Sequence, residues 1–343
     1  MAQAASALID DFARHGGRIG MAQAAFPRMD RWTDLSTGIA PWSYQAAASA
    51  QSAAELPDPA ALSALEAAAA GFFGADPARV VAVPGSDLAM RLLGLLLGRR
   101  SFVFRPAIVR PGYSGHAAMW GGHEAMACTA EEITSIAPTH DVLVLARPNN
   151  PDGIVADPLL LEWASLTMSA RGGHLLVDEA FADADPACSL AGRGWPGLIV
   201  LRSFGKFFGL AGLRLGFVIA PPAIISDLRA LMGDWPVSGP ALATGLAAYR
   251  DTAWHGAQRA RLATASQRLA ALLTRNGIDI VGQTPFFVLA SAEHRDRLFV
   301  HLAEAGVLTR PFDYEPCWLR IGLPRDENDW ARLDEALVIW RTQ

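Results

Sequence analysis

Lysine is almost missing from this chain of 343 residues. Lys and Arg together number 29, and 28 of them are arginine, so Lys206 is the single lysine. Arginine can replace lysine as a surface charge, but its guanidinium is not deprotonated in proteins and cannot act as a nucleophilic amine. Lysine can form a Schiff base with a carbonyl compound. We therefore expect that the chain needs an amine at position 206.

Cysteine and positive charge are also scarce. The three cysteines, Cys128, Cys188 and Cys317, are widely spaced, and neither they nor the eight histidines show the spacing of a disulfide framework or a metal site. The net charge of −5 gives no support for a nucleic-acid-binding surface. We therefore expect no metal and no nucleic-acid partner.

A long apolar segment and a basic N-terminal start are absent as well. The most apolar run, residues 88–97, contains Arg91 and is too short to span a bilayer. The N-terminal residues include Asp10 and Asp11 and no basic start, so they do not resemble a signal peptide. These features predict a cytoplasmic protein without a membrane partner.

Short apolar runs alternate with helical patterns through the middle of the chain. Near-continuous apolar runs of strand length are typical of strands that are covered on both faces, and the alternation predicts an α/β layer with a largely parallel sheet. A helix is predicted at residues 158–170. The five predicted strands are residues 80–83, 141–146, 174–178, 197–202 and 215–220.

The C-terminal part has a different pattern. A mostly helical stretch follows Pro221-Pro222, a turn at W-P-V-S-G-P (235–240) interrupts it, and residues 242–276 predict one long helix. Predicted strands around 286–290 and 318–321 belong to a smaller α+β unit. The expected domains are an N-terminal segment (1–35), a large domain (36–225) and a small domain (226–343) that includes the long helix.

Polar residues follow four of the predicted strands. In α/β sheets, ligands bind beyond the carboxyl ends of the strands, so we expect these residues to share one rim. They are Gly85-Ser86-Asp87, Asn149-Asn150-Pro151, Asp178-Glu179, and Ser203 with Lys206. The rim would combine a phosphate-type loop, an amide, a carboxylate and an amine.

Motifs in this rim resemble the fold-type I pyridoxal-phosphate enzymes of the class I/II aminotransferase superfamily. D-E-A-F begins at Asp178, 28 residues before the lysine in S-F-G-K-F-F-G-L-A-G-L-R-L-G-F, and R-P-N-N-P-D-G (147–153) resembles the N-P-x-G turn of that group. The resemblance runs from about Asp34 to the C-terminus. It implies a large domain with a mostly parallel mixed sheet and helices on both faces, a smaller α+β C-terminal domain, bound pyridoxal 5'-phosphate and a homodimer.

The resemblance also assigns roles around the cofactor. Lys206 would form the Schiff base with the cofactor aldehyde, and Asp178 would pair with the pyridine nitrogen, which makes the ring an electron sink. Asn150 would hydrogen-bond the ring hydroxyl oxygen and contact the substrate. Tyr113, in P-G-Y-S-G-H, would stack on the ring. Lys206, Asp178 and Tyr113 form the predicted catalytic set.

Two anionic groups also need partners. For the cofactor phosphate, Ser86 and Asp87 offer backbone N–H groups at a helix N-terminus, Ser203 offers a hydroxyl and Arg214 a guanidinium fork. Arg320, in W-L-R-I-G, matches the family arginine that grips the substrate α-carboxylate.

Two positions depart from the aminotransferases that act on histidinol phosphate. Those enzymes have tyrosine after D-E-A, where this chain has Phe181, and tyrosine before P-D-P, where it has Leu56. H-G-G (15–17), D-L-S-T-G-I-A-P-W (34–42), D-E-A-F, L-P-D-P and W-P-V-S-G-P instead resemble the cobalamin-pathway L-threonine-O-3-phosphate decarboxylases. That resemblance implies formation of (R)-1-amino-2-propanol phosphate.

A phosphorylated amino acid substrate needs a second anion site. His15, Ser36, Thr37 and Gly38 are candidates, because small residues let backbone N–H groups approach an oxyanion. The bond of the substrate α-carbon that stands perpendicular to the cofactor ring is the one that breaks. A decarboxylase places the bond to the carboxylate there and an aminotransferase the bond to hydrogen, so an aminotransferase remains the alternative. A cofactor-binding regulatory or scaffold protein without turnover is a third possibility.

Overall fold

The computed structural model describes residues 9–45, 50–99 and 103–342, and these residues form two compact units. Unit 1 combines Met1–Trp42 with Ala257–Gln343, and unit 2 is Ser43–Gly256. The predicted division at residues 35 and 225 stays a prediction. The reading of the N-terminus as lacking a signal peptide falls partly on residues 1–8, which lie outside the described residues.

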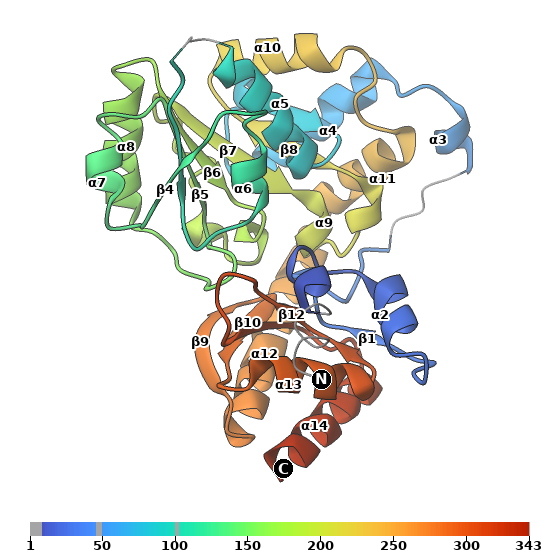
Figure 1. The fold of residues 1–343 in the computed structure, drawn as a ribbon. Helices are drawn as coiled ribbons and strands as arrows, with labels where there is room; N and C mark the ends of the chain where they lie inside the picture. The colour runs from blue at the N-terminus through green and yellow to red at the C-terminus, as the bar shows by residue number, and fades with distance from the viewer. Residues whose placement is uncertain (1–8, 46–49, 100–102, 343) are drawn as a thin grey trace. The chain divides into compact units, whose positions relative to one another are not determined.

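Unit 2 is built on a mixed sheet, which among the described residues has seven strands (Figure 1). Strand β8 is antiparallel to both of its neighbours, and the other strands are parallel to one another. In sheet order the strands are β2 (Val80–Val83), β8 (Gly216–Ile219), β7 (Leu198–Ser203), β6 (His174–Asp178), β5 (Val142–Ala146), β3 (Pro106–Val109) and β4 (Met126–Cys128). The five strands predicted from apolar runs are confirmed, and β3 and β4 were missed.

Both faces of this sheet are buried except at its edge strand β4, as its near-continuous apolar strands require. On one face Val144, Leu176 and Ile199 pack in one core with Leu93 of helix α5 (Ser86–Gly98). On the other face, α8 (Pro158–Ser169) packs against β6. The remaining helices of the unit are α3 (Ala50–Ala54), α4 (Pro59–Phe73), α6 (Gly115–Ala118), α7 (Ile133–Ile136), α9 (Phe204–Phe207), α10 (Pro222–Met232) and α11 (Gly239–Arg250).

Unit 1 is an α+β structure around an antiparallel sheet with the strand order β12-β13-β10-β9. Its strands are β12 (Arg310–Pro311), β13 (Trp318–Gly322), β10 (Phe287–Ser291) and β9 (Asp279–Thr284), and β1 (Thr33–Asp34) pairs separately with β11 (Val307–Leu308). Helices α2 (Ile19–Ala25), α13 (Arg295–Glu304) and α14 (Glu327–Arg341) belong to it. The strands predicted around 286–290 and 318–321 are confirmed.

The prediction of one long helix over residues 242–276 is wrong. The structure has two helices here, α11 (Gly239–Arg250) and α12 (Thr252–Arg275), and Asp251 stands between them with ψ of 77°. The Asp251 carboxylate accepts a hydrogen bond from the backbone N–H of Trp254 at 3.0 Å. An aspartate that satisfies the first N–H groups of a helix marks a new start, and the continuous Ala, Leu and Arg pattern hid that signal.

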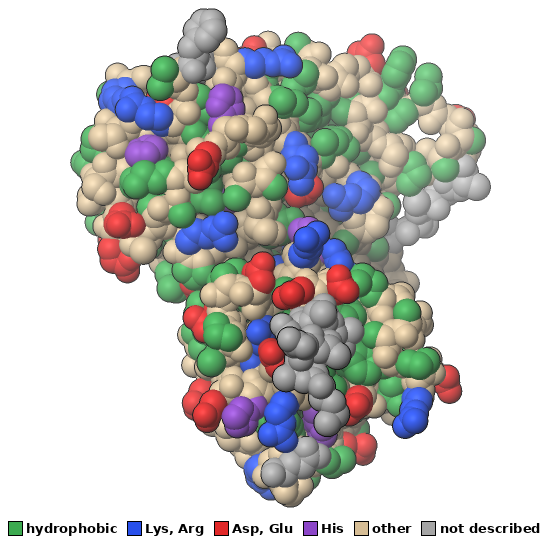
Figure 2. All heavy atoms as spheres, in the orientation of Figure 1, with side chains coloured by type: hydrophobic (Ala, Val, Ile, Leu, Met, Phe, Trp, Pro, Cys, Tyr) green, Lys and Arg blue, Asp and Glu red, His purple; other side chains and the backbone are tan. Residues whose placement is uncertain are grey.

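Among the described residues, no helix combines the length and apolar character needed to cross a membrane. On the face of the molecule drawn in Figure 2, acidic and basic side chains of the described residues are interspersed rather than gathered by sign.

Candidate active site

The predicted rim of unit 2 forms where parallel strands end side by side. Ala146 of β5, Asp178 of β6 and Leu201 of β7 are in register, so these three strands reach the same edge of the sheet together. Ser203 ends β7, and Lys206 follows in the short helix α9, where it is half-buried. The tertiary structure therefore brings the predicted carboxylate and the predicted amine to one edge.

Asp178 is buried and held from two sides. One carboxylate oxygen lies 3.2 Å from Nε2 of the buried His116, and the other accepts the backbone N–H of Ala180 at 3.1 Å. His116 was missed in the sequence, although it stands in the P-G-Y-S-G-H segment. Its only local signal was its position three residues after Tyr113 at the start of a short helix. His116 fixes the orientation of the Asp178 carboxylate.

Tyr113 is held close to the same pair. Its ring meets that of His116 edge to face at 5.7 Å between centroids, and its hydroxyl donates a hydrogen bond to Asp87 Oδ1 at 3.2 Å. Gly115 makes room for the ring, because a Cβ at this position would lie 2.3 Å from Cε1 of Tyr113. The glycine thus makes room for the Tyr113 ring beside His116.

The start of helix α5 and Arg214 form a cradle suited to an anion. Gly85 has φ of +90°, and a Cβ there would lie 2.7 Å from Nη2 of Arg214, so the guanidinium lies against bare backbone. Arg214 itself has a left-handed backbone with φ of 52° and donates to the Ala211 carbonyl. Helix N-termini present N–H groups and a positive dipole end, so the backbone N–H groups of Ser86 and Asp87 suit a phosphate.

Ser203 lies beside this cradle. It pairs with Gly216 across β7 and β8, and a Cβ on Gly216 would lie 2.7 Å from the backbone nitrogen of Ser86. The structure therefore brings together the phosphate residues predicted from three separate segments.

The loop that carries Asn150 is fixed by its neighbours. Asn149 donates from Nδ2 to the Pro111 carbonyl and to Asp152 Oδ1, both at 2.9 Å, and Asp152 also accepts the N–H of Ile154 at 3.0 Å. Asn150 is buried within this turn. The turn is thus held rigidly at the end of β5.

Phe181, noted above as a departure from related enzymes, lies next to the lysine. The Lys206 Nζ atom lies 5.7 Å from the centre of the buried Phe181 ring. This distance is within the range in which an aromatic face attracts a cation. The ring thus replaces a hydrogen-bonding tyrosine with a purely aromatic contact.

These features of unit 2 fit pyridoxal 5'-phosphate. A carboxylate oriented by His116 suits a protonated ring nitrogen, and the glycine cradle with Arg214 suits a phosphate. Lys206 is the chain's only lysine, and a lysine amine can form a Schiff base. The individual roles stay predictions.

In unit 1 the predicted Arg320 has a second arginine directly opposite. Arg320 of β13 and Arg310 of β12 are register partners, and both are buried. Arg320 donates from Nη2 to the Ser36 carbonyl at 2.9 Å, and Arg310 donates from Nη2 to the Arg14 carbonyl at 3.2 Å. Burial lowers the pKa of Arg320 well below its usual value, and the charge of Arg310 lowers it further. Arg310 was missed because only the strand pairing brings it beside Arg320.

The segment of predicted substrate-phosphate residues is assembled in the same unit. The Ser36 hydroxyl accepts the N–H of Gly17 at 2.8 Å, and a Cβ on Gly16 would lie 2.3 Å from the Ser36 carbonyl oxygen. Gly16 and Gly17 therefore lie against Ser36 and Thr37. Ser36 and Gly38 are buried, Thr37 is partly buried and His15 is exposed. Their roles as phosphate ligands stay predictions.

Residues 36–337 match the family Aminotransferase class I and II. The chain belongs to this family. It is 43% identical over 331 residues to a threonine-phosphate decarboxylase from Pseudomonas aeruginosa, and the matched region covers 94% of this chain and 97% of that protein. It is 37% identical to a threonine-phosphate decarboxylase from a Sinorhizobium species, with the same coverage.

A solved structure extends the comparison to the fold. The histidinol-phosphate aminotransferase of Sinorhizobium meliloti in complex with pyridoxal-5'-phosphate superposes with a TM-score of 0.80 at 18% identity, covering 93% of this chain and 92% of that chain. The expected family and the expected fold class of this class I/II aminotransferase-family chain are therefore confirmed.

Proposed function

We propose that this protein decarboxylates L-threonine O-3-phosphate to (R)-1-amino-2-propanol phosphate in cobalamin biosynthesis, as a pyridoxal 5'-phosphate enzyme. In the reaction, the bond between the α-carbon and the carboxylate breaks, carbon dioxide leaves and a proton is added to the α-carbon. We also propose that the protein is cytoplasmic and a homodimer. The names of its two decarboxylase relatives, at 43% and 37% identity, support the choice of reaction.

The observation that carries the substrate class is the buried pair of arginines in unit 1. A substrate with a carboxylate and a phosphate has two anionic groups, and Arg310 and Arg320 place two guanidinium groups at register positions directly opposite each other. Guanidinium forks bind both kinds of anion through paired hydrogen bonds. Burial and the charge of Arg310 lower the pKa of Arg320 and so make its cation less stable. A bound anion would stabilise this cation.

Unit 2 would supply the chemistry. When bound, pyridoxal 5'-phosphate withdraws electrons from the bond that breaks at the α-carbon. Lys206 Nζ would hold the cofactor through its aldehyde and would hold the proton that is added to the α-carbon. Asp178, oriented by His116, would hold a proton at the pyridine nitrogen. Arg214 and the start of α5 would bind the phosphate and so orient the ring.

The test is to incubate the protein with L-threonine O-3-phosphate, without any keto acid, and to measure carbon dioxide. Lys206→Arg is the matched variant, because it keeps the positive charge and removes the nucleophilic amine. Turnover should fall by at least about 100-fold, the range expected for loss of a positioned proton-transfer group. Amino transfer that depends on a keto acid, without release of carbon dioxide, would instead establish the aminotransferase. Normal turnover by Lys206→Arg would remove Lys206 from the mechanism.

A further inference from the structure

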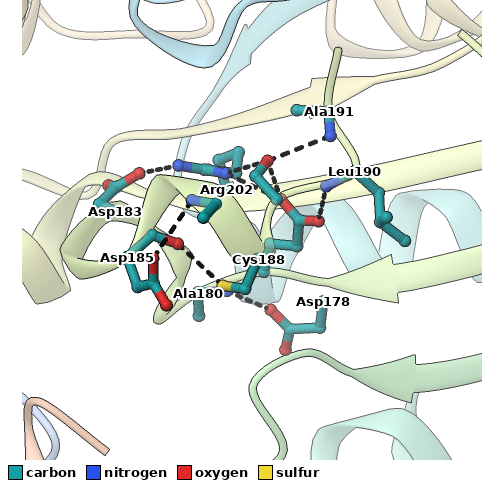
Figure 3. Close-up of polar contacts among 11 residues, drawn as sticks. Asp178, Ala180, Asp183, Asp185, Cys188, Leu190, Ala191 and Arg202 are labelled. Carbon is teal, nitrogen blue, oxygen red and sulfur yellow. Dashed lines mark hydrogen bonds and ion pairs between the residues drawn. The ribbon is translucent and has the colours of Figure 1, made fainter. Parts of the chain in front are cut away.

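A buried cluster of charges lies beside the active-site rim, centred on Arg202 of β7 (Figure 3). Arg202 Nη1 donates to Glu179 Oε2 at 2.8 Å and to the Ser189 hydroxyl at 2.9 Å, and Arg202 Nη2 pairs with Asp183. Glu179 also accepts the Ser189 hydroxyl at 2.7 Å and the N–H of Leu190 at 2.5 Å. The proposed mechanism uses none of these groups.

The cluster joins the ends of the two strands that carry the reactive groups. Glu179 directly follows Asp178, and Arg202 stands four residues before Lys206. The backbone N–H of Glu179 donates to the Leu201 carbonyl at 2.9 Å, so β6 and β7 stay paired up to this point. Successive side chains of a strand point to opposite faces, and Figure 3 shows the Asp178 side chain directed away from Arg202. The cluster therefore supports the strand ends that form the rim, on the side opposite the Asp178 side chain.

Arg202 holds the chain on both sides of one active-site residue. Its two carboxylate partners are Glu179, two residues before Phe181, and Asp183, two residues after it. Phe181 is the ring that lies 5.7 Å from Lys206 Nζ. A single guanidinium thus bridges the two ends of the short segment that presents the ring to the amine.

Stability alone does not account for such a cluster. Taking three charges out of water is costly, and well-packed apolar side chains of similar volume often stabilise a core equally well or better. What an ionic cluster supplies is a defined geometry, because a planar guanidinium fork accepts its partners in few arrangements. Phe73 of α4 closes the other side, 4.6 Å from the guanidinium carbon to the ring centre.

We propose that Arg202 is a positioning residue, which holds Glu179 and Asp183 so that the Phe181 ring stays against the Lys206 amine. This inference rests on the proposed function in taking Lys206 as the reactive group. It adds a residue that does not touch the substrate or the cofactor and acts only through Phe181.

The test uses the fact that Lys206 is the only lysine. Growth with isotope-labelled lysine gives the full chain one lysine side-chain NMR signal, and its pH titration reports the Lys206 amine without added cofactor. Replacing the ring in Phe181→Leu should lower the titration midpoint by about half to one pH unit, because an aromatic face favours the charged amine. No shift in this variant would overturn the proposal.

The decisive measurement is a double-mutant cycle with Arg202→Met. Loss of the Arg202 charge by itself shifts the titration midpoint of the Lys206 amine. Comparing the effect of Phe181→Leu with and without Arg202 cancels this contribution. If Arg202 acts through the ring, Phe181→Leu should shift the midpoint much less in the Arg202→Met background than in the native chain. An equal shift in both backgrounds would overturn the proposal. Should Arg202→Met fail to fold, Asp183→Asn tests the same coupling, because it weakens one of the two anchors.

Arg229→Met is the matched control. It removes an arginine from another carboxylate pair of unit 2, with Glu66 at 2.6 Å, and the effect of Phe181→Leu should be unchanged in that background. An equal loss of coupling in Arg229→Met would mean that general loosening of the unit, rather than Arg202, is responsible. Adding pyridoxal 5'-phosphate separates the two proposals. A native chain that shows no visible absorbance change fails the proposed function, while the cofactor-free titration still decides the role of Arg202.

Discussion

Arg202 of unit 2 and Arg320 of unit 1 are both buried, but they have opposite electrostatic surroundings. Arg202 in unit 2 and Arg320 in unit 1 are 2% and 3% exposed, and burial acts to lower the pKa of both. Asp183 and Glu179 more than offset this at Arg202 and raise its pKa above the usual value. At Arg320 the nearby Arg310 adds to the effect of burial, and the pKa falls well below the usual value.

The difference separates two uses of the same side chain. An arginine that the fold supplies with two carboxylates is a fixed internal clamp, and its charge is already compensated. An arginine that the fold places opposite another arginine is set up to receive an anion, since bound negative charge relieves the repulsion. The comparison predicts that substitutions at the first arginine and its partners affect folding and geometry, whereas substitutions at the second affect substrate binding.

The largest effect is expected at the arginine pair of unit 1. Arg320→Met should lower kcat/KM for L-threonine O-3-phosphate by about 100- to 1000-fold, the range seen when one partner of a buried, hydrogen-bonded charge pair is truncated. Steady-state kinetics check this, with thermal unfolding measured alongside. The stability of the chain should change little, because the variant removes a repulsion with Arg310. If Arg320→Met instead strongly lowered the stability and left kcat/KM unchanged, the proposed difference between Arg320 and Arg202 would be wrong.

At the cluster of unit 2 the expected effect is on stability rather than on substrate binding. Glu179→Leu leaves Arg202 without one carboxylate and leaves the Leu190 N–H without its acceptor. The free energy of unfolding should fall by roughly 3–5 kcal/mol, the cost of breaking a buried ion pair. Urea unfolding of the full chain measures this change. Arg310→Leu is the counterpart in unit 1, and a loss of similar size there would show that the two regions do not differ in kind.

The smallest effect appears only at alkaline pH. Burial raises the pKa of Cys188 from 9.0 to about 11, with Glu179 and Asp185 adding to the rise, and burial likewise raises the pKa of Cys128 to about 11. Between these values the unfolded chain has lost the thiol proton and the folded chain still holds it. The free energy of unfolding should therefore fall as pH rises from about 9 to 11, by about 1.4 kcal/mol per pH unit for each thiol.

Unfolding titrations of Cys188→Ala and Cys128→Ala separate the two contributions. Each variant should lose its own part of the alkaline decline in the free energy of unfolding. Near neutral pH the pH dependence should stay the same, because the folded and unfolded states both keep the thiol proton there. Cys188 also senses the charges around Arg202. In the Glu179→Leu background its contribution should shrink, and that of Cys128 should stay the same. Equal changes for both thiols would show that Cys188 does not sense the cluster.

Much of the fold could be predicted because burial on both faces leaves a simple pattern. The strands with unbroken apolar runs, such as β5 and β7, were found in the sequence. Strand β4 was missed because two of its three residues are exposed, so it has no apolar run. The break at Asp251 was missed because a single capping residue interrupts a long helical pattern without changing its composition.

The sequence by itself determined the candidates whose chemistry or spacing is rare. Lys206 stands out as the only lysine, and Asp178 and Arg214 stand at recognisable distances from it along the chain. Their positions at strand ends follow from local apolar patterns, because such patterns depend only on neighbouring residues.

Only the tertiary structure decided which groups support these candidates. His116 contacts Asp178, which is 62 residues away along the chain. Strand pairing places Arg310 opposite Arg320. Arg202 pairs with Glu179 and Asp183, which lie on the two sides of Phe181 in the sequence. Each of these contacts joins residues from separate elements, and the strength of a buried charge contact depends on a few tenths of an ångström and on exclusion of water. Neither quantity is written in the order of the residues, so the arginines that look alike in the sequence acquire their different roles only in the folded chain.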